Sequence, residues 1–408
     1  MATPREDTPW LIETSSGVRE VRDAVGGAEL SPDDTHLALW GAASQSLRGV
    51  PRGRVVLARV VDGAELHTLD FGDREIVRTL LTPEGALLVV HHEPRTNLVT
   101  VEWFDLHARE RTGSLVLADL GELRQVDHAP NAHRALFCGL RGWSLVDLRG
   151  VGVVAQAAWA DHQHNWSPYR DGNYIDAYVH PDGGSFVLDV NTSDESSTRH
   201  VVTVGKTAAQ RVEVEGVIGQ SARWIDRVHF ADFADVPSSE NECVVRVFDV
   251  ERPYSHGEIF GAETEDIPQY IRELFLNLVD VAWTADGHRA VLCNRTRERP
   301  YECSVATVDL FGDTRPHRAV VRLPQALIAT SVDCLSDHSA LIFTKDKEGA
   351  YVGVFDLFDG SIEWECVPAP RTRRFPREVR ASPGGRFALL GASHTHGARV
   401  IDQLVTLA

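Results

Sequence analysis

The sequence predicts an all-β protein built as a tandem array of small antiparallel sheets. The first observation behind this prediction is a turn-and-strand pattern that recurs about every fifty residues. Each copy has an apolar run, a turn rich in Pro, Asp and Gly, and a second apolar run. The copies begin at Leu30, Leu81, Val179, Trp283, Leu335 and Ala381. A period of this size indicates repeated β units that are each too small to bury their own faces.

The turn in these copies has a local physical cause. In Pro83-Glu84-Gly85, for example, the proline presets φ for the second position of a type I turn, and the glycine tolerates a left-handed exit. Ser31-Pro32-Asp33 opens the first copy in the same way. We therefore expect the apolar runs on either side of each turn to be antiparallel neighbours.

The second observation is a third strand that ends in an apolar residue followed by aspartate. These aspartates are Asp62, Asp105, Asp147, Asp249, Asp309, Asp356 and Asp402. The gap between Asp147 and Asp249 holds one more slot at 202–205, which lacks the aspartate. A fourth strand follows, for example at 151–155 and 361–367. The first turn is degenerate near 126–131 and 222–234, where strands are expected from spacing alone.

Four strands in each unit of this length are typical of propeller blades. We predict a single β-propeller domain over 1–408, with loop insertions at 159–174 and 261–278. Eight blades are favoured, and seven is the alternative if the degenerate fifth unit is an insertion. The chain ends six residues after Asp402. The run at 9–13 is therefore expected to supply a strand that closes the last blade and removes two exposed sheet edges.

The strand-end aspartates resemble the Trp-Asp position of WD-repeat proteins. The turns that begin Ser-Pro, at Ser31 and Ser382, resemble both that family and TolB-type propellers. The resemblance covers nearly the whole chain, which looks like a divergent, bacterial member of this group. It implies a rigid, non-catalytic platform that holds a protein partner on its loop-rich face. An enzymatic role is not expected.

Composition and charge narrow the class of partner. The chain is 43% hydrophobic and 25% charged, as in soluble globular proteins, and its net charge is −18. A phosphate backbone would repel so acidic a chain, so nucleic acid is not an expected partner. The six cysteines form no C-x-x-C pair, which favours free thiols in a reducing compartment. With no signal core and no apolar run of about 18 residues, we expect a cytoplasmic protein without a membrane partner.

Two insertions carry candidate contact residues. In the insertion at 159–174, Trp166 and Tyr169 are candidate anchors for a partner, or they fold back and cap the end of a blade. In the insertion at 261–278, apolar residues at helical spacing predict an amphipathic helix. That helix either packs on the propeller or offers a docking surface.

A sector rich in arginine is the third candidate surface. Its candidate partner-binding residues are Arg295, Arg297, Arg299, Arg373 and Arg374. Guanidinium groups bind carboxylates or phosphates in bidentate fashion, so an acidic segment of a protein partner or an anionic ligand would fit. The alternative is a solvated rim whose charges do little.

The rival function is a small-ligand-binding protein or metal-dependent enzyme with its site at the mouth of the central channel. Its candidate residues are the loop histidines His91, His92, His162, His164, His394 and His396. No spacing motif groups them as metal ligands. No cofactor is expected either, because His200 replaces the first glycine of a phosphate loop and Asp194 replaces the glycine of a calcium loop. A third alternative is a structural subunit of a larger assembly.

Overall fold

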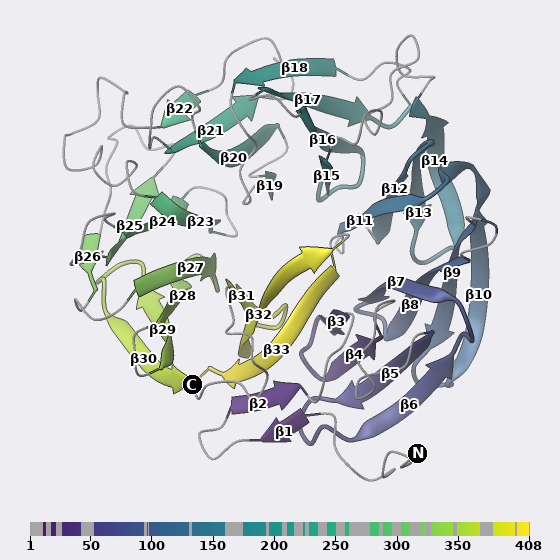
Figure 1. Cartoon of the computed structure of the whole chain (residues 1–408), viewed down its shortest axis with the longest axis horizontal. Helices are drawn as coiled ribbons and strands as arrows, with labels where there is room; N and C mark the ends of the chain where they lie inside the picture. Colours follow the sequence, from purple (N-terminus) through teal and green to yellow (C-terminus); the bar gives the residue numbers. More distant parts are fainter. Residues whose placement is uncertain are drawn as a thin grey trace. The chain divides into compact units, whose positions relative to one another are not determined.

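The structure is a computed structural model of the chain. It describes residues 11–13, 18–21, 27–41, 53–93, 96, 98–129, 133–159, 174–192, 196–205, 210–215, 223–224, 228–235, 243–249, 258–260, 278–284, 289–295, 303–309, 320–323, 328–345, 349–367, 378–395 and 398–407. Within these residues the chain is almost entirely strand, with one short 3-10 helix, η1 (Ala118–Leu120). The strands form eight antiparallel sheets in the described part (Figure 1). The predicted all-β architecture of small antiparallel sheets is confirmed.

The contacts divide the chain into two compact units, which are described separately. Unit 1 comprises residues 1–123, 149–152 and 367–408, and unit 2 comprises 124–148 and 153–366.

Unit 1 contains three of the sheets. The first is β3 (Gly27–Leu30), β4 (His36–Trp40), β5 (Arg54–Arg59) and β6 (Glu65–Asp70). The second is β7 (Glu75–Leu81), β8 (Ala86–Glu93), β9 (Leu98–Asp105) and β10 (Glu110–Leu117). The third has five strands in the order β1 (Leu11–Glu13), β2 (Val18–Val21), β33 (Ala398–Thr406), β32 (Phe387–Thr395) and β31 (Glu378–Ala381).

Unit 2 contains five four-stranded sheets, and each follows chain order. The first two are β11 (Leu123–Ala129), β12 (Arg134–Gly139), β13 (Gly142–Asp147), β14 (Gly152–Ala158), and β15 (Tyr174–Val179), β16 (Ser185–Thr192), β17 (Ser196–Thr203), β18 (Gln210–Glu215). The third is β19 (Arg223–Trp224), β20 (His229–Asp235), β21 (Cys243–Asp249), β22 (Glu258–Phe260). The last two are β23 (Leu278–Trp283), β24 (Arg289–Arg295), β25 (Cys303–Asp309), β26 (Val320–Arg322), and β27 (Ile328–Cys334), β28 (Ser339–Lys345), β29 (Ala350–Asp356), β30 (Ile362–Val367).

The recurring turns join the first and second strands of their sheets, as the sequence predicts. The hydroxyl that opens the turn accepts a hydrogen bond from the backbone N–H at the start of the second strand. This bond is 2.9 Å from His36 N to Ser31 Oγ and 3.0 Å from Phe387 N to Ser382 Oγ. The degenerate copies also form strand pairs, since β19 pairs with β20 and β11 with β12. Spacing alone therefore located these strands correctly.

The aspartate at the end of the third strand is a turn cap. Asp105 Oδ1 accepts hydrogen bonds from the backbone N–H groups of His107 and Ala108, at 2.7 and 2.8 Å. Asp356 Oδ1 accepts the equivalent bonds two and three residues downstream. Such caps satisfy backbone donors in the turn between the third and fourth strands. Asp62 also caps its turn, by accepting a hydrogen bond from Ala64 N, but it does not end its strand as expected. Strand β5 ends at Arg59, so Asp62 lies within the turn.

Residues near the two ends of the chain share one sheet. Strand β2 pairs antiparallel with β33, with Val18 opposite Val405, and β1 pairs with the other edge of β2 (Figure 1). The run at 9–13 was expected to pair with the C-terminal strand, and the structure describes it from Leu11 as β1. The strand that pairs with β33 is β2, and within the described residues β1 pairs only with β2. Asp402 does not end its strand, since β33 continues to Thr406.

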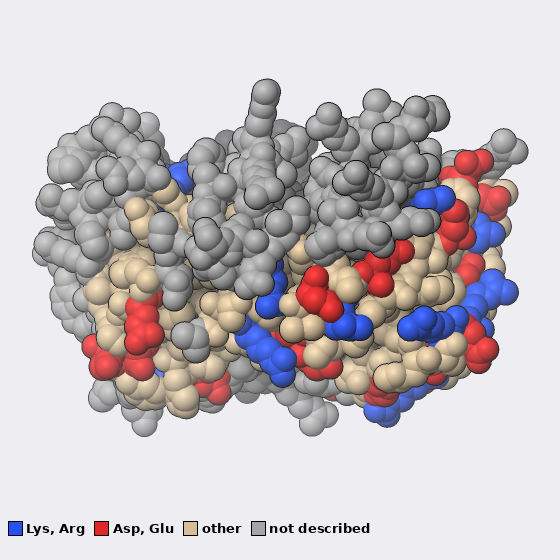
Figure 2. Space-filling view, turned by 90° about the horizontal axis from the view of Figure 1, so that it is seen from below, with Lys and Arg blue, Asp and Glu red and all other residues tan. Residues whose placement is uncertain are grey.

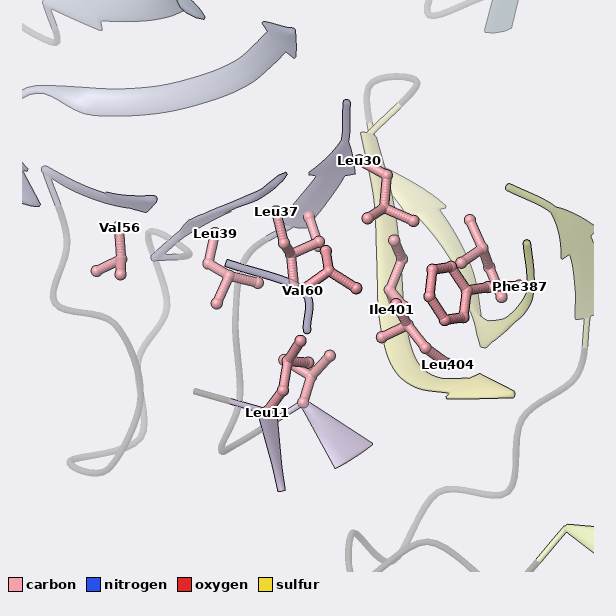
Figure 3. Packing of buried hydrophobic residues seen from close by; sticks show 12 residues of the cluster. Leu11, Leu30, Leu37, Leu39, Val56, Val60, Phe387, Ile401 and Leu404 are labelled. Atoms are coloured by element: carbon pink, nitrogen blue, oxygen red, sulfur yellow. The ribbon is translucent and has the colours of Figure 1, made fainter. Parts of the chain in front are cut away.

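The core of unit 1 lies between its sheets. Leu30 and Leu39 from the first sheet meet Phe387, Ile401 and Leu404 from the sheet of β31–β33, and all of these side chains are buried (Figure 3). A second cluster joins the β3–β6 sheet to the β7–β10 sheet. Each small sheet therefore buries its faces against a neighbour, as a repeat array requires.

Carboxylates also join neighbouring sheets. Asp34 accepts hydrogen bonds from Ser382 Oγ at 2.5 Å, Gly384 N at 3.0 Å and Arg386 N at 3.0 Å, all in the turn that joins β31 to β32. A Cβ atom at Gly384 would lie 2.7 Å from the Asp34 carboxylate, so the close approach needs glycine there. We call Asp34 and two equivalents in unit 2 the bridging aspartates.

The other two bridging aspartates each join the first strands of two sheets in unit 2. Asp127 Oδ2 in β11 accepts a bond of 2.7 Å from Val179 N in β15. Asp280 Oδ2 in β23 accepts a bond of 2.9 Å from Val332 N in β27. In both pairs the donor lies 52 residues downstream of the aspartate. The same polar contact therefore recurs with the repeat.

Replacing Asp34 by alanine should destabilise unit 1. The substitution leaves donors of the 382–386 turn without their acceptor, and Asp34 itself has φ of 58°. We expect a loss of about 3 kcal/mol in the free energy of unfolding. Asp34→Asn, which keeps one acceptor oxygen and tolerates positive φ, should lose only about 1 kcal/mol.

Urea denaturation followed by circular dichroism measures both losses. The control is Asp62→Ala, which removes an exposed carboxylate that pairs with Arg59 and caps its own turn but bridges to no other sheet in the described structure, and it should cost about 1 kcal/mol. Equal midpoints for Asp34→Ala and Asp62→Ala would show that the bridge does not stabilise the fold.

Candidate functional site

Most of the predicted partner-binding residues lie outside the described residues. These are Trp166, Tyr169, Arg297, Arg299, Arg373 and Arg374, and the helix predicted within 261–278 lies there too. Of the first insertion, 159–174, the structure describes its two ends. At the first of these, Trp159 is fully buried and its indole Nε1–H donates a 2.8 Å hydrogen bond to the Gly139 carbonyl. This tryptophan holds the end of the insertion against unit 2.

Arg295 is the one predicted arginine within the described residues. It ends β24, is half-buried, and lies opposite Cys303 in the register with β25. Burial raises the pKa of the nearby Cys293 thiol well above its ordinary value, and the Arg295 charge partly opposes that rise. Cys138, Cys293, Cys303 and Cys334 are all free thiols. Arg295 is therefore anchored in the sheet at the point where the chain continues toward Arg297.

The described surface seen from one side mixes charges of both signs. Figure 2 shows acidic and basic side chains interspersed over the described residues in the centre and right of that face. Arg54–Asp70 and Arg59–Asp62 are exposed pairs of this kind, at 3.1 and 2.8 Å. Such pairs contribute little to stability.

The expectation that His91 and His92 lie in a solvent-facing loop is wrong. Both residues belong to β8, because the apolar run before them continues the strand through Glu93. His91 is 2% exposed. Its ring lies 5.3 Å from the Phe71 ring and its Nε2 lies 3.1 Å from Glu102 Oε1, on β9. His91 is thus a core residue of unit 1.

Glu102 is the centre of a buried polar cluster. Its side chain is 7% exposed, and it also accepts bonds from the half-exposed Arg74 at 3.2 Å and the exposed Arg111 at 3.4 Å. A neutral His91 ring bonds to this carboxylate only when its Nε2 carries the proton, because a carboxylate only accepts. Burial lowers the pKa of His91, and the Arg74 charge lowers it further, while Glu102 raises it. The net direction is downward, so this histidine is held neutral.

The other histidines of the rival site give no cluster. His394 belongs to β32, of which only the backbone is described at that position, and His162, His164 and His396 lie outside the described residues. Among the side chains that the structure describes, no group of His, Cys, Asp and Glu is placed to hold a metal ion. No segment of the described structure forms a helix with the length and hydropathy that crossing a membrane requires.

A cavity of about 530 Å³ lies between the first two sheets of unit 1. Its floor is apolar and continues the core shared by these sheets. The floor residues include Val55, Leu57, Leu69, Leu81, Leu87 and Phe104. The cavity volume is within the range of small-molecule and side-chain pockets in proteins. We call this space the inter-sheet cavity.

A β-bulge shapes one wall of the inter-sheet cavity. In the register of β5 with β6, Leu57 faces His67 and Ala58 faces Glu65, so Leu66 is an extra residue without an opposite partner. A bulge bends the strand and re-aims its side chains. As a result Leu66 and His67, neighbours in sequence, both line the cavity.

The opposite wall is made by two turns of the second sheet. Gly85 has φ of 82°, and a Cβ atom there would lie 3.2 Å from His107 Nε2. The absent side chain lets the turn after β9 pack over the turn after β7, where Leu106 N donates to the Gly85 carbonyl at 3.1 Å. His107 and Arg109 are thereby brought to the rim of the cavity.

Carboxylates line the same rim. Partial burial alone would raise the pKa of Asp33, but hydrogen bonds from Ser31 and Thr35 dominate and lower it to about 2. The backbone N–H groups of Ala108 and His107 lower the pKa of Asp105. Each of these aspartates receives its bonds on Oδ1, so within the described structure Oδ2 is uncommitted. Glu84, the third carboxylate, pairs with Arg149 at 3.2 Å.

The inter-sheet cavity was missed by reasoning from sequence. Most of its polar residues lie in turns between strands, which were interpreted from the sequence as structural. Asp33 and Asp105 do cap their turns. The available signal was histidine in or beside those turns, at His36, His67 and His107. Nothing in the local sequence shows that turns fifty residues apart share a cavity.

Comparisons with known proteins support the fold class and no more. No family model and no curated protein matches the chain. The C-terminal WD40 domain of Sif2 is similar in structure, with a TM-score of 0.57 and 11% identity over 98% of this chain and 99% of that one. The computationally designed Ika8 protein has a TM-score of 0.53 and 12% identity over 95% and 98% of the two chains. Such similarity supports a propeller-like fold.

The His91 cluster predicts a specific pH dependence. The unfolded chain binds a proton at the ordinary histidine pKa of 6.5, whereas the folded chain resists protonation. The stability supplied by neutral His91 is therefore present above pH 6.5 and is lost as the pH falls through the lower folded value. His91→Gln, which can still donate to Glu102, should lack this component.

The measurement is the free energy of unfolding of both proteins between about pH 7.5 and about pH 5. The advantage of the wild type should shrink as the pH falls. His67→Gln is the control, and it should follow the wild-type pH curve because His91 is intact. Parallel curves for wild type and His91→Gln would contradict the assignment.

Proposed function

We propose that this protein is a non-catalytic interaction scaffold that presents a loop-rich face to a protein partner. The observation that carries the proposal is the end of the sheets from which the two longest connections leave. At one end of the strands are short turns, such as 31–35 and 82–85. The long connections, 159–173 and 261–277, leave from the other end. Binding residues concentrate on loops that a rigid frame positions.

The frame is rigid at the turn end. Strand-end aspartates cap the turns there, and Asp34 bridges one turn to the next. Trp166 and Tyr169 belong to a connection at the opposite end, as do Arg297 and Arg299 in the β24–β25 connection. Arg373 and Arg374 belong to the β30–β31 connection, also at that end. Within each sheet these candidate residues therefore belong to connections at the end away from the capped turns.

The proposed partner is a protein with an acidic segment. Clustered arginines in a chain of net charge −18 would recognise carboxylates by bidentate hydrogen bonds. Trp166 and Tyr169 would supply apolar anchors for the same partner. The similarity to a WD40 domain supports this role only through the fold.

We further propose that the sheets close into one eight-bladed propeller in the cytoplasm. Eight described sheets and the β2–β33 pairing support the blade count and the closure. The free thiols support a reducing compartment. The alternative enzyme at a channel mouth loses one of its candidate residues, because His91 is buried against Glu102.

Charge reversal tests the proposed contact surface. The variant Arg295→Glu/Arg297→Glu/Arg299→Glu should lose a partner that the wild type retains in an affinity pull-down from the native host, identified by mass spectrometry. The physical reason is repulsion between the new carboxylates and an acidic segment.

The matched control reverses three exposed cations at the turn end of the sheets, Arg59, Arg149 and Arg386. It makes the same change in net charge and should retain the partner. Retention of every partner by the first variant would rule out this arginine surface, and loss by both variants would indicate a general charge effect.

A further inference from the structure

We infer that the inter-sheet cavity is a second recognition site, which binds an arginine side chain and an adjoining apolar side chain of a partner polypeptide. It lies at the turn end of the β3–β6 and β7–β10 sheets, away from the long connections, so it does not depend on the proposed function. Its volume of about 530 Å³ suits two adjoining side chains better than one.

The apolar floor of the cavity favours the apolar part of a bound side chain. Val55, Leu57 and Leu87 are fully buried beneath it, while Leu66, Leu69 and Phe104 are half-buried and border it. Covering these half-buried side chains removes apolar surface from water, at about 25 cal/mol for each Å². The methylene groups of arginine and a leucine-sized neighbour would provide that cover.

The rim selects a cation. Asp33 and Asp105 are both held ionised at neutral pH by the hydrogen bonds of their own turns, and each has an uncommitted Oδ2. The caps fix these carboxylates before any ligand arrives, so little side-chain entropy is lost on binding. Against them the lining has one guanidinium, that of Arg109, which makes no ion pair within the described structure. The excess of uncommitted charge is negative.

The aromatic lining favours arginine over lysine. Phe104 and the imidazoles of His36, His67 and His107 border the cavity. A guanidinium plane stacks on such rings and forms bidentate hydrogen bonds to carboxylates, whereas an ammonium group does neither as well.

The test is fluorescence anisotropy with the full-length protein and a labelled, amidated Gly-Leu-Arg-Leu-Gly peptide. We expect saturable binding that weakens several-fold with lysine in place of arginine. Citrulline, which keeps the shape without the charge, should abolish it, and glutamate should do the same. Absence of saturable binding to the arginine peptide, or equal binding of the citrulline peptide, would overturn the inference.

Variants locate the site. Asp33→Asn/Asp105→Asn keeps the capping oxygens, removes both charges, and should weaken binding at least about tenfold. Leu66→Phe fills the cavity from the bulge without changing any charge and should also abolish binding. Arg109→Gln removes the opposing charge and should strengthen binding. The matched control is Asp62→Asn/Asp70→Asn, two exposed carboxylates of the first sheet that do not line the cavity.

Each outcome has one meaning once circular dichroism confirms a folded chain. Equal weakening by the control pair would show a general charge effect and contradict the site. Unchanged binding by both Asp33→Asn/Asp105→Asn and Leu66→Phe would also contradict it. Peptide binding should persist in the Arg295→Glu/Arg297→Glu/Arg299→Glu variant, which would show that this site is separate from the loop surface. The pull-down with that variant tests the loop surface independently.

Discussion

Everything in this structure depends on the junction between one small sheet and the next. A four-stranded sheet cannot bury both of its faces alone, so its stability comes from a neighbour. Apolar side chains such as Leu39 and Leu404 supply most of the contact in one junction of unit 1. The bridging aspartates add directional hydrogen bonds to these junctions, because Asp34, Asp127 and Asp280 each accept a bond from a backbone N–H group of the neighbouring sheet. A hydrogen-bonded bridge of this kind fixes the register of two sheets, which apolar contact alone does not.

Aspartates in the turns therefore perform two tasks that look alike in sequence. Asp33 and Asp34 are adjacent, yet Asp33 caps its own turn while Asp34 bridges to another sheet. The cap orients one carboxylate oxygen inward and leaves the other available at the rim of the inter-sheet cavity. A stable turn and a pre-organised anionic rim thus arise from the same hydrogen bonds, and a structural residue can also belong to a binding site.

The parts of the fold that could be predicted from sequence are those with local causes. The turn at 82–85 and the strand end at Asp105 follow from patterns within a few consecutive residues, so their positions were predicted correctly. His91 was misplaced because its partner, Glu102, is on the next strand, and a polar pair at the end of an apolar run looks like a loop. The inter-sheet cavity depends on a one-residue bulge at Leu66 and on the packing of two sheets. Neither leaves a signature in a single stretch of sequence.

The pairing of β2 with β33 has a consequence for the order of folding. Val18 and Val405 are opposite each other, so this strand pair cannot form until nearly the whole chain has been synthesised. The other sheets of the described structure consist of strands consecutive in the chain, and each can assemble as soon as its own residues emerge. Closing so long a loop carries a high entropic cost and slows the step that requires it. During synthesis β1 and β2 must therefore wait with one edge of β2 unpaired until β33 emerges, and the completion of this one sheet separates a string of finished repeats from the native protein.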